Sequence, residues 1–222
     1  MAAIEEGHWW FRERRHIIAR AIAGLTPSTA LDIGAGAGGN TRELEAAGWQ
    51  ATALEFSDAG VELARARGLE VVQGDARDMP FPDDSFGLAV AYDVLEHIKE
   101  DDQVVAEIAR VVRPGGKVLI AVSAYPRLWS PHDEAVGHVR RYTRPELVAL
   151  FDGPRFEINA VRSWNVLLRP VVARRRKQVE DFDLAPLPKV LNEALALFIK
   201  AERRLPLANR NGVSLMLEAT VK

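Results

Sequence analysis

The glycine-rich segment LDIGAGAGGN is the first part of the chain whose residue types suggest a ligand site. It can be read as G-x-G-x-x-G, through Gly34, Gly36 and Gly39, which is typical of dinucleotide binding. It can also be read as D-x-G-x-G-x-G, through Asp32, Gly34, Gly36 and Gly38. In both cases a glycine turn between a strand and a helix lets the backbone approach a ligand at the positive end of the helix. The glycines alone leave the cofactor undecided.

Carboxylates at the ends of three predicted strands narrow this choice. Asp32 precedes the first glycine by two positions, where it would repel a phosphate but would suit an ammonium or a sulfonium group. Glu55 can accept hydrogen bonds from both hydroxyls of a ribose, a role that serves either cofactor. Asp75 can accept a hydrogen bond from the exocyclic amine of an adenine. The ordered set therefore favours a cofactor with a sulfonium over a dinucleotide.

These residues need a parallel sheet to bring them together. Residues 29–123 alternate short apolar runs with helix-patterned segments, which is typical of parallel strands joined by crossover helices. Gly48 is predicted to end the first of these helices, Ser57 to cap the second, and Thr143 with Glu146 to form a capping box. The predicted strands are TALDIG, QATALEFS, LEVVQGDA, FGLAVAYDV, KVLIAVSA, RFEINAVRSW and VSLMLEATVK.

At this point the chain resembles the class I S-adenosylmethionine-dependent methyltransferases, especially the small bacterial type. The resemblance rests on the glycine loop, on GDARDMPFPDDSFGLAVAYDVLEHI and on ARVVRPGGKVLI, and it is strong over residues 29–123. It implies an α/β, Rossmann-like sheet of seven mostly parallel strands, with helices on both faces and the last strand antiparallel. It also implies S-adenosyl-L-methionine as the cofactor.

The resemblance carries over to particular positions of the cofactor site. It implies that the methionine portion of the cofactor is bound by Asp32, Gly34, Gly36 and Gly38. The ribose would be bound by Glu55, and the adenine by Asp75 and Ala76. Phe56 would pack on the adenine ring, although a core position explains this residue equally well.

Methyl transfer from a sulfonium is an in-line displacement, so positioning supplies most of the rate. A base is needed only where the acceptor must lose a proton, and histidine is the usual candidate near neutral pH. His97, after the fourth strand, is one candidate, although it could instead cap or pack the next helix. Asp93, at the end of that strand, is expected to line the pocket.

The segment LWSPHDEAVGHVRRY follows the fifth strand, where this fold places its acceptor pocket. Its candidates for a base and for anion-binding groups are His132, Asp133, His138, Arg141 and Tyr142. We predict His138 as the base, with Tyr142 as the second choice. A surface loop with paired charges is the alternative. His132, Asp133 and His138 do not have a recognised ligand spacing, so no metal is predicted.

The N-terminal segment HWWFRERRHII predicts a lid helix within residues 1–25. Trp10 is predicted to shield the cofactor, and Arg14, one turn later, could reach the carboxylate of its methionine portion. The alternative is an amphipathic helix with its isoleucines on the core.

We predict one domain over residues 1–222, with a core sheet in 29–163 and 212–222 and a helical insertion at 164–211. The insertion contains the basic run RRRK and a helix with an apolar side. That side is formed by Val190, Leu191, Ala194, Phe198, Ala201 and Leu205. It could form a pocket wall, a dimer face or a surface that touches lipid.

Composition limits the remaining partners. A net charge of −2 gives no global basic field for nucleic acid, and the absence of cysteine removes disulfides and thiolate chemistry. No signal peptide or long apolar run is present, so we expect a soluble cytoplasmic protein, a monomer or a homodimer, with peripheral membrane contact at most.

The sequence thus predicts methyl transfer to a small molecule, which could be hydrophobic, anionic or lipid-linked. The rivals are an NAD-dependent oxidoreductase, for which no Y-x-x-x-K motif is evident, and a non-catalytic cofactor-binding regulatory protein.

Overall fold

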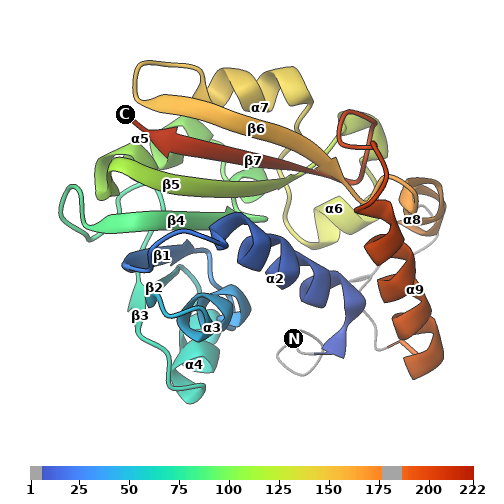
Figure 1. Ribbon diagram of the computed structural model, residues 1–222, viewed down its shortest axis with the longest axis horizontal. Helices are drawn as coiled ribbons and strands as arrows, with labels where there is room; N and C mark the ends of the chain where they lie inside the picture. Colours follow the sequence, from blue (N-terminus) through green and yellow to red (C-terminus); the bar gives the residue numbers. More distant parts are fainter. Residues whose placement is uncertain (1–6, 177–186) are drawn as a thin grey trace.

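A computed structural model describes residues 7–176 and 187–222 of the chain. Seven strands form one sheet in the order β3-β2-β1-β4-β5-β7-β6, in which β7 runs antiparallel to both of its neighbours (Figure 1). The strands are β1 (Thr29–Ile33), β2 (Gln50–Glu55), β3 (Val71–Gln73), β4 (Phe86–Tyr92), β5 (Val112–Ser123), β6 (Phe156–Trp164) and β7 (Ser214–Val221). This is the predicted Rossmann-like sheet, with its last strand antiparallel as expected.

Helices cover both faces of the sheet. The α-helices are α2 (Trp9–Ile22), α3 (Gly39–Ala46), α4 (Asp58–Ala66), α5 (Asp101–Val111), α6 (Pro131–Ala135), α7 (Arg144–Phe151), α8 (Arg169–Arg176) and α9 (Lys189–Glu202). Two short 3-10 helices, η1 (Leu95–His97) and η2 (Pro126–Leu128), follow β4 and β5. Apolar residues of α5 and α7 pack on one face, and those of α2, α3 and α9 pack on the other. The strand β4 lies between these layers and is buried along its whole length, as its unbroken apolar run requires.

Local signals in the sequence set where the helices begin and end. The hydroxyl of Ser57 accepts a hydrogen bond from the backbone N–H of Gly60 at 3.2 Å, and Thr143 forms the predicted capping box with Glu146. Gly48 follows α3 in the left-handed region, with φ +88°. The two caps satisfy backbone N–H groups at the starts of α4 and α7, and the turn at Gly48 ends α3. These three helix ends lie where the sequence predicts them.

The predicted insertion contributes α8 and α9, and its residues 177–186, including Lys177 of the basic run, lie outside the described part. The inner side of α9 packs on α2. Glu13 of α2 pairs with Arg203, and the backbone N–H of Trp9 donates to Asn192 at 2.8 Å. Within α2, Ile18 is fully buried, which confirms its core side. The helix α2 and the insertion therefore support each other at the end of the sheet where β4 and β6 finish (Figure 1).

Candidate active site

The glycine loop after β1 has the backbone geometry that its composition predicts. Gly34, Gly36 and Gly38 all have positive φ, at +65°, +56° and +82°, a region that other residues rarely adopt. A Cβ atom at Gly34 would also lie 2.6 Å from Cγ2 of Val94. Gly39 is the first residue of α3, as predicted, so the loop aims the positive end of this helix at the cavities beside it.

Asp32 lies beneath this loop and is fully buried. Its Oδ2 atom accepts a hydrogen bond from the hydroxyl of Thr41 at 2.7 Å, which ties the end of β1 to α3. Asp32 is not among the residues that line the two cavities described below. Its predicted contact with the methionine portion of a cofactor stays a prediction. From this buried position Asp32 would act on a bound cofactor through its charge and not through direct contact.

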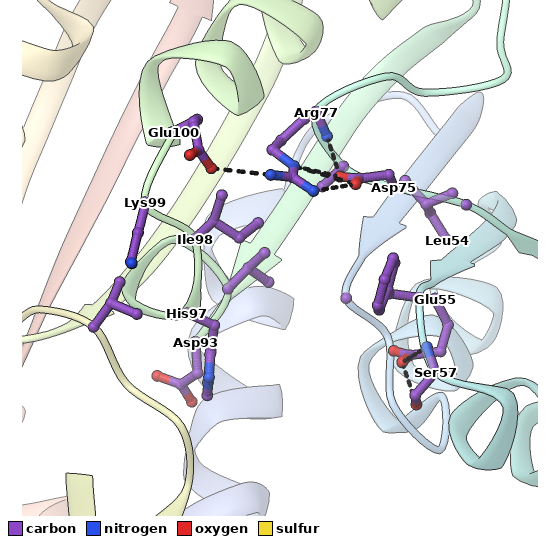
Figure 2. Close-up of a pocket in the computed structure, with 16 residues that line it drawn as sticks. Leu54, Glu55, Ser57, Asp75, Arg77, Asp93, His97, Ile98, Lys99 and Glu100 are labelled. Carbon is purple, nitrogen blue, oxygen red and sulfur yellow. Dashed lines mark hydrogen bonds and ion pairs between the residues drawn. The ribbon is translucent and has the colours of Figure 1, made fainter. Parts of the chain in front are cut away.

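A first cavity of about 700 Å³ lies at the ends of β1, β2 and β4 and contains the residues predicted to bind a nucleoside (Figure 2). Its lining includes Gly34, Glu55, Phe56, Asp75, Ala76, Asp93 and His97. Phe56 is 72% exposed, so its alternative role as a core residue is wrong. An exposed aromatic ring at a cavity rim is available to stack on a flat ligand.

Glu55 closes the glycine loop from the side of β2. Its carboxylate accepts hydrogen bonds from the backbone N–H of Gly36 at 2.8 Å and from both the N–H and the hydroxyl of Ser57. Space for this carboxylate depends on Gly60, because a Cβ atom there would lie 2.6 Å from Cγ of Glu55. A carboxylate has about four lone-pair positions, so this one retains capacity for a further donor.

Asp75 is held by a partner that the sequence reasoning did not identify. Arg77 donates to both carboxylate oxygens of Asp75 and also reaches Glu100 at 2.9 Å (Figure 2). These hydrogen bonds from Arg77 lower the pKa of the Asp75 carboxyl. An adenine amine would therefore share this carboxylate with Arg77. The two-residue spacing of Asp75 and Arg77 in the segment GDAR could have indicated this pair.

A second cavity of about 590 Å³ lies between α2, the glycine loop, α6 and the helices of the insertion. It meets the first cavity at three shared residues, Gly34, Asp93 and His97. Four of the five histidines in the chain line it, namely His8, His97, His132 and His138. Apolar side chains of the insertion form another part of its lining, including Leu168, Val171, Val172, Leu187 and Leu195. The cavity is thus polar near the glycine loop and apolar near α8 and α9.

Trp10 and Arg14 of α2, which were predicted to contact the cofactor, both line this second cavity. The Trp10 ring packs on Trp164, with ring centroids 4.4 Å apart. Arg14 is only 3% exposed, and its Nη2 atom lies 2.8 Å from Oδ2 of Asp93. Its guanidinium also lies 4.9 Å from the centre of the Tyr92 ring. Arg14 was predicted to reach a ligand carboxylate, and here it pairs with Asp93 while its Nη1 atom has no hydrogen-bond partner among the described residues.

His138 is held by a buried carboxylate. Its Nδ1 atom lies 2.8 Å from Oδ1 of Asp133, which also accepts a hydrogen bond from Nε of Arg141 at 2.8 Å. Burial by itself would raise the pKa of Asp133, but hydrogen bonds from His138 and Arg141 outweigh it and hold this pKa well below its usual range. An ionised carboxylate only accepts hydrogen bonds, so Nδ1 of His138 carries a proton and the neutral ring offers Nε2 as its basic nitrogen.

His97 and Glu96 lie beside this group. The rings of His97 and His138 meet edge to face with centroids 4.7 Å apart. Burial is the main cause that lowers the pKa of His97, and a proton gained by the neighbouring His138 would lower it further, so the ring of His97 is neutral at neutral pH. Glu96 is fully buried and accepts a hydrogen bond from the backbone N–H of Ser123 at 2.8 Å. Burial and the charge of Asp93 raise the pKa of Glu96 to about 7.

Tyr142 lies away from both cavities, and this position argues against the predicted role as a base. Its hydroxyl donates to Asp101 at 2.6 Å and lies 3.1 Å from the carbonyl of Leu95. Burial and the hydrogen bond to Asp101 raise its pKa, which makes the phenol harder to ionise. Tyr142 therefore fixes η1 against the start of α5. Its neighbours in the sequence, RR, gave no signal of this role.

The described residues form neither a metal site nor a membrane-spanning helix. Within residues 7–176 and 187–222, no three or more histidine, aspartate or glutamate side chains are arranged to hold a metal ion. None of the described helices is both long and apolar enough to cross a membrane.

Comparison with known proteins places these cavities in a family context. Residues 31–120 match the family described as "Methyltransferase domain". Over 117 residues the chain is 30% identical to the demethylmenaquinone methyltransferase of Renibacterium salmoninarum. This alignment covers 52% of this chain and 49% of that protein. Over 120 residues it is 36% identical to the fatty-acid O-methyltransferase of Mycolicibacterium smegmatis, which covers 51% and 43% respectively. The chain spans about half the length of the curated relatives it matches.

Solved structures show the same fold at lower sequence identity. Phosphoethanolamine N-methyltransferase 2 of Haemonchus contortus, in complex with S-adenosyl-L-methionine, matches with a TM-score of 0.64 and 22% identity. The match covers 94% of this chain and 52% of that chain. At this identity the likeness establishes the arrangement of the sheet and its helices.

Proposed function

Because the chain belongs to the class I S-adenosylmethionine-dependent methyltransferases, we propose that it transfers a methyl group to an amphiphilic small molecule through an oxygen that must lose a proton. The single observation that carries this proposal is the meeting of the two cavities at Gly34, Asp93 and His97. A nucleoside in the first cavity and an acceptor in the second would face each other there, which is the arrangement an in-line displacement needs.

The residues of the first cavity fit S-adenosylmethionine. The glycine loop leaves room for close backbone approach, Glu55 retains acceptor capacity for a ribose, and the exposed ring of Phe56 is available for an adenine. When bound, this cofactor supplies a methyl group on a positively charged sulfur. The family match also decides between the two readings of the glycine pattern, in favour of the sulfonium cofactor over NAD.

The second cavity supports an acceptor with a polar head and an apolar body. Arg14 pairs with Asp93 and His97 packs against His138 at the end shared with the first cavity, whereas Leu168, Val172 and Leu195 belong to the insertion. A hydrophobic chain placed along the apolar wall would bring its ionisable group to the polar end. The named activities of two relatives, on a demethylated quinone and on a fatty acid, are consistent with such an acceptor.

His138 is the base in this proposal. Asp133 holds Nδ1, which orients the ring and leaves Nε2 to take the proton from the acceptor oxygen. Arg141 balances the charge of Asp133 and adds a hydrogen bond to the carbonyl of Ala124 at 3.0 Å, so the pair is fixed to the end of β5. The ring of His97 packs against His138 and limits its motion.

The first experiment measures cofactor binding by calorimetry with S-adenosylmethionine, S-adenosylhomocysteine and NAD. We expect binding of the first two only. The second follows transfer of labelled methyl from S-adenosylmethionine to isoprenoid quinols, whose hydroxyl must lose a proton, and to long-chain carboxylic acids, which are already ionised near neutral pH and need no base. Cofactor binding without transfer to any of these acceptors would favour the non-catalytic alternative, although the open second cavity speaks against that reading.

His138→Ala tests the base, with His16→Ala as the matched control because His16 is the one histidine that lines neither cavity. We expect kcat to fall by about 10²- to 10⁴-fold in His138→Ala, the range typical of a lost general base. Cofactor affinity should stay unchanged, and His16→Ala should behave like the parent. Unchanged turnover of His138→Ala across the pH range would exclude this base.

A further inference from the structure

The helix α9 has two apolar sides, and within residues 7–176 and 187–222 only one of them packs against other elements. Ile199 is fully buried on the inner side, and Leu195 reaches the second cavity. The apolar side that the sequence spacing predicts lies on the outer face of α9. On this face Val190 is 84% exposed and Leu197 is 70% exposed. Leu191, Phe198 and Leu205 continue this outward stripe at helical spacing. We call Val190, Leu191, Leu197, Phe198 and Leu205 the outer stripe.

Specific polar contacts fix α9 in this orientation. Glu202 is buried and accepts hydrogen bonds from the backbone N–H groups of Val166 and Leu167 at 3.0 and 2.8 Å. Arg203 pairs with Glu13 of α2, next to the inner side. Turning the outer stripe inward would break these contacts and bury charge, so its exposure follows from the packing of the helix.

The surface around the outer stripe is basic. Residues 164–211 contain ten lysines and arginines and five acidic residues, a net charge of +5, so the rest of a chain with net charge −2 carries −7. Lys189, Lys200 and Arg204 are exposed on or beside α9. Both acids of the described part are engaged, since Glu193 pairs with Arg12 at 2.5 Å and Glu202 is buried.

Apolar side chains flanked by lysine and arginine match a bilayer surface that contains anionic lipid. The apolar stripe would enter the boundary between headgroups and acyl chains, and the cations would lie among the phosphates. A second copy of this chain is a poorer occupant, because a self-complementary dimer would bring this basic surface against itself.

The helices α8 and α9 also form part of the wall of the second cavity. Val171 of α8 is 61% exposed and also lines that cavity, as does Leu195 of α9. Figure 1 shows α8 and α9 at one edge of the molecule, beside α6. A bilayer in contact with the outer stripe would therefore lie beside the two helices that form the apolar wall of the cavity.

We propose that the outer stripe of α9 and the exposed lysines and arginines beside it dock this protein on anionic lipid bilayers. This docking does not require methyl transfer, so the proposal can hold or fail separately from the function above. The test is sedimentation of the full chain with phosphatidylglycerol vesicles and with phosphatidylcholine vesicles at low and high salt. We expect binding to phosphatidylglycerol that weakens with salt, and much weaker binding to phosphatidylcholine.

The variant Val190→Asn with Leu197→Asn removes the two most exposed residues of the stripe and leaves its inner contacts intact. We expect its affinity for phosphatidylglycerol vesicles to fall by about tenfold or more. Leu63→Asn on α4 is the matched control, because Leu63 is an exposed leucine outside the insertion, and it should bind like the parent.

Three results would overturn the proposal. The first is that the parent does not bind phosphatidylglycerol vesicles. The second is that the double variant binds these vesicles as well as the parent does. The third is that the parent forms a stable dimer and binds no vesicles, while the double variant is a monomer. The last result would assign the stripe to an interface between two copies.

Discussion

Asp133 lies at the centre of a buried charge cluster, and replacing it with asparagine should destabilise the fold strongly. Its two oxygens accept hydrogen bonds from the amide and hydroxyl of Ser130, from His138 and from Arg141. The side chains of Asp133 and Arg141 are both fully buried. Asp133→Asn would leave the Arg141 cation without its counter-charge in a place that water does not reach. Breaking one partner of such a pair costs about 3–5 kcal/mol, a large part of the 5–15 kcal/mol typical of folded domains.

Asp83→Asn is the matched control, because Asp83 pairs with Arg110 at 2.9 Å but its side chain is 74% exposed. An exposed pair of this kind contributes about 1 kcal/mol or less. A third variant, Asp133→Asn with Arg141→Met, removes both buried charges. We expect it to be more stable than Asp133→Asn alone, because it no longer buries an unpaired cation.

Urea unfolding followed by two spectroscopic probes gives the free energy of unfolding of each variant. The pH dependence follows from the depressed pKa of Asp133. Its contribution to stability is present above the ordinary value of about 3.8 and is lost as the pH falls through the lower folded value. The parent should therefore lose its advantage over Asp133→Asn in acid. The reasoning would be refuted if Asp133→Asn cost no more than Asp83→Asn, or if Asp133→Asn with Arg141→Met were no more stable than Asp133→Asn alone.

Three further changes test other parts of the site. The pKa of Glu96 is raised from 4.5 to about 7, so the parent should lose about 3 kcal/mol of stability as the pH rises through this window, whereas Glu96→Gln should not. Urea unfolding of both proteins from pH 4 to 8 tests this, and the same pH dependence in both would contradict it. Gly34→Ala should lower stability by about 1 kcal/mol or more and abolish cofactor binding in calorimetry, because it forces a Cβ into Val94 at positive φ. Phe56→Ala should leave thermal stability nearly unchanged but weaken S-adenosylmethionine binding by about tenfold, the scale of a lost stacking contact.

The cofactor side of the site was largely predictable because its signals are local. A run of glycines before a helix requires a turn with positive φ, and strand ends of a parallel sheet meet at one edge. Gly34, Glu55, Asp75 and Asp93 therefore line the same cavity, as their positions in the sequence imply. Asp32 is the exception, because it lies inside β1 between β2 and β4, where it is buried and hydrogen-bonded to Thr41 and does not line either cavity.

The acceptor side was predicted only in part, because it is assembled from segments far apart in the chain. His8 and Tyr92 join His138 in the second cavity through the packing of α2 on the sheet, and no local pattern announces this contact. Tyr142 appears beside His138 in the sequence but turns to Asp101, which removes it from the cavity. In the same way, the apolar spacing of α9 is real, but only tertiary packing decides that Ile199 faces inward and Leu197 outward.

The sequence by itself thus determined the class of sheet, its strand segments and the glycine turn proposed to receive a cofactor, because hydrophobic period, helix caps and glycine φ angles act over a few residues. The order of the strands in the sheet came from the tertiary structure. The tertiary structure decided which histidine has a carboxylate partner, which charges are buried and which apolar face remains exposed. Those properties depend on neighbours that folding brings together from distant parts of the chain, and the free energies of burial and pairing belong to these contacts.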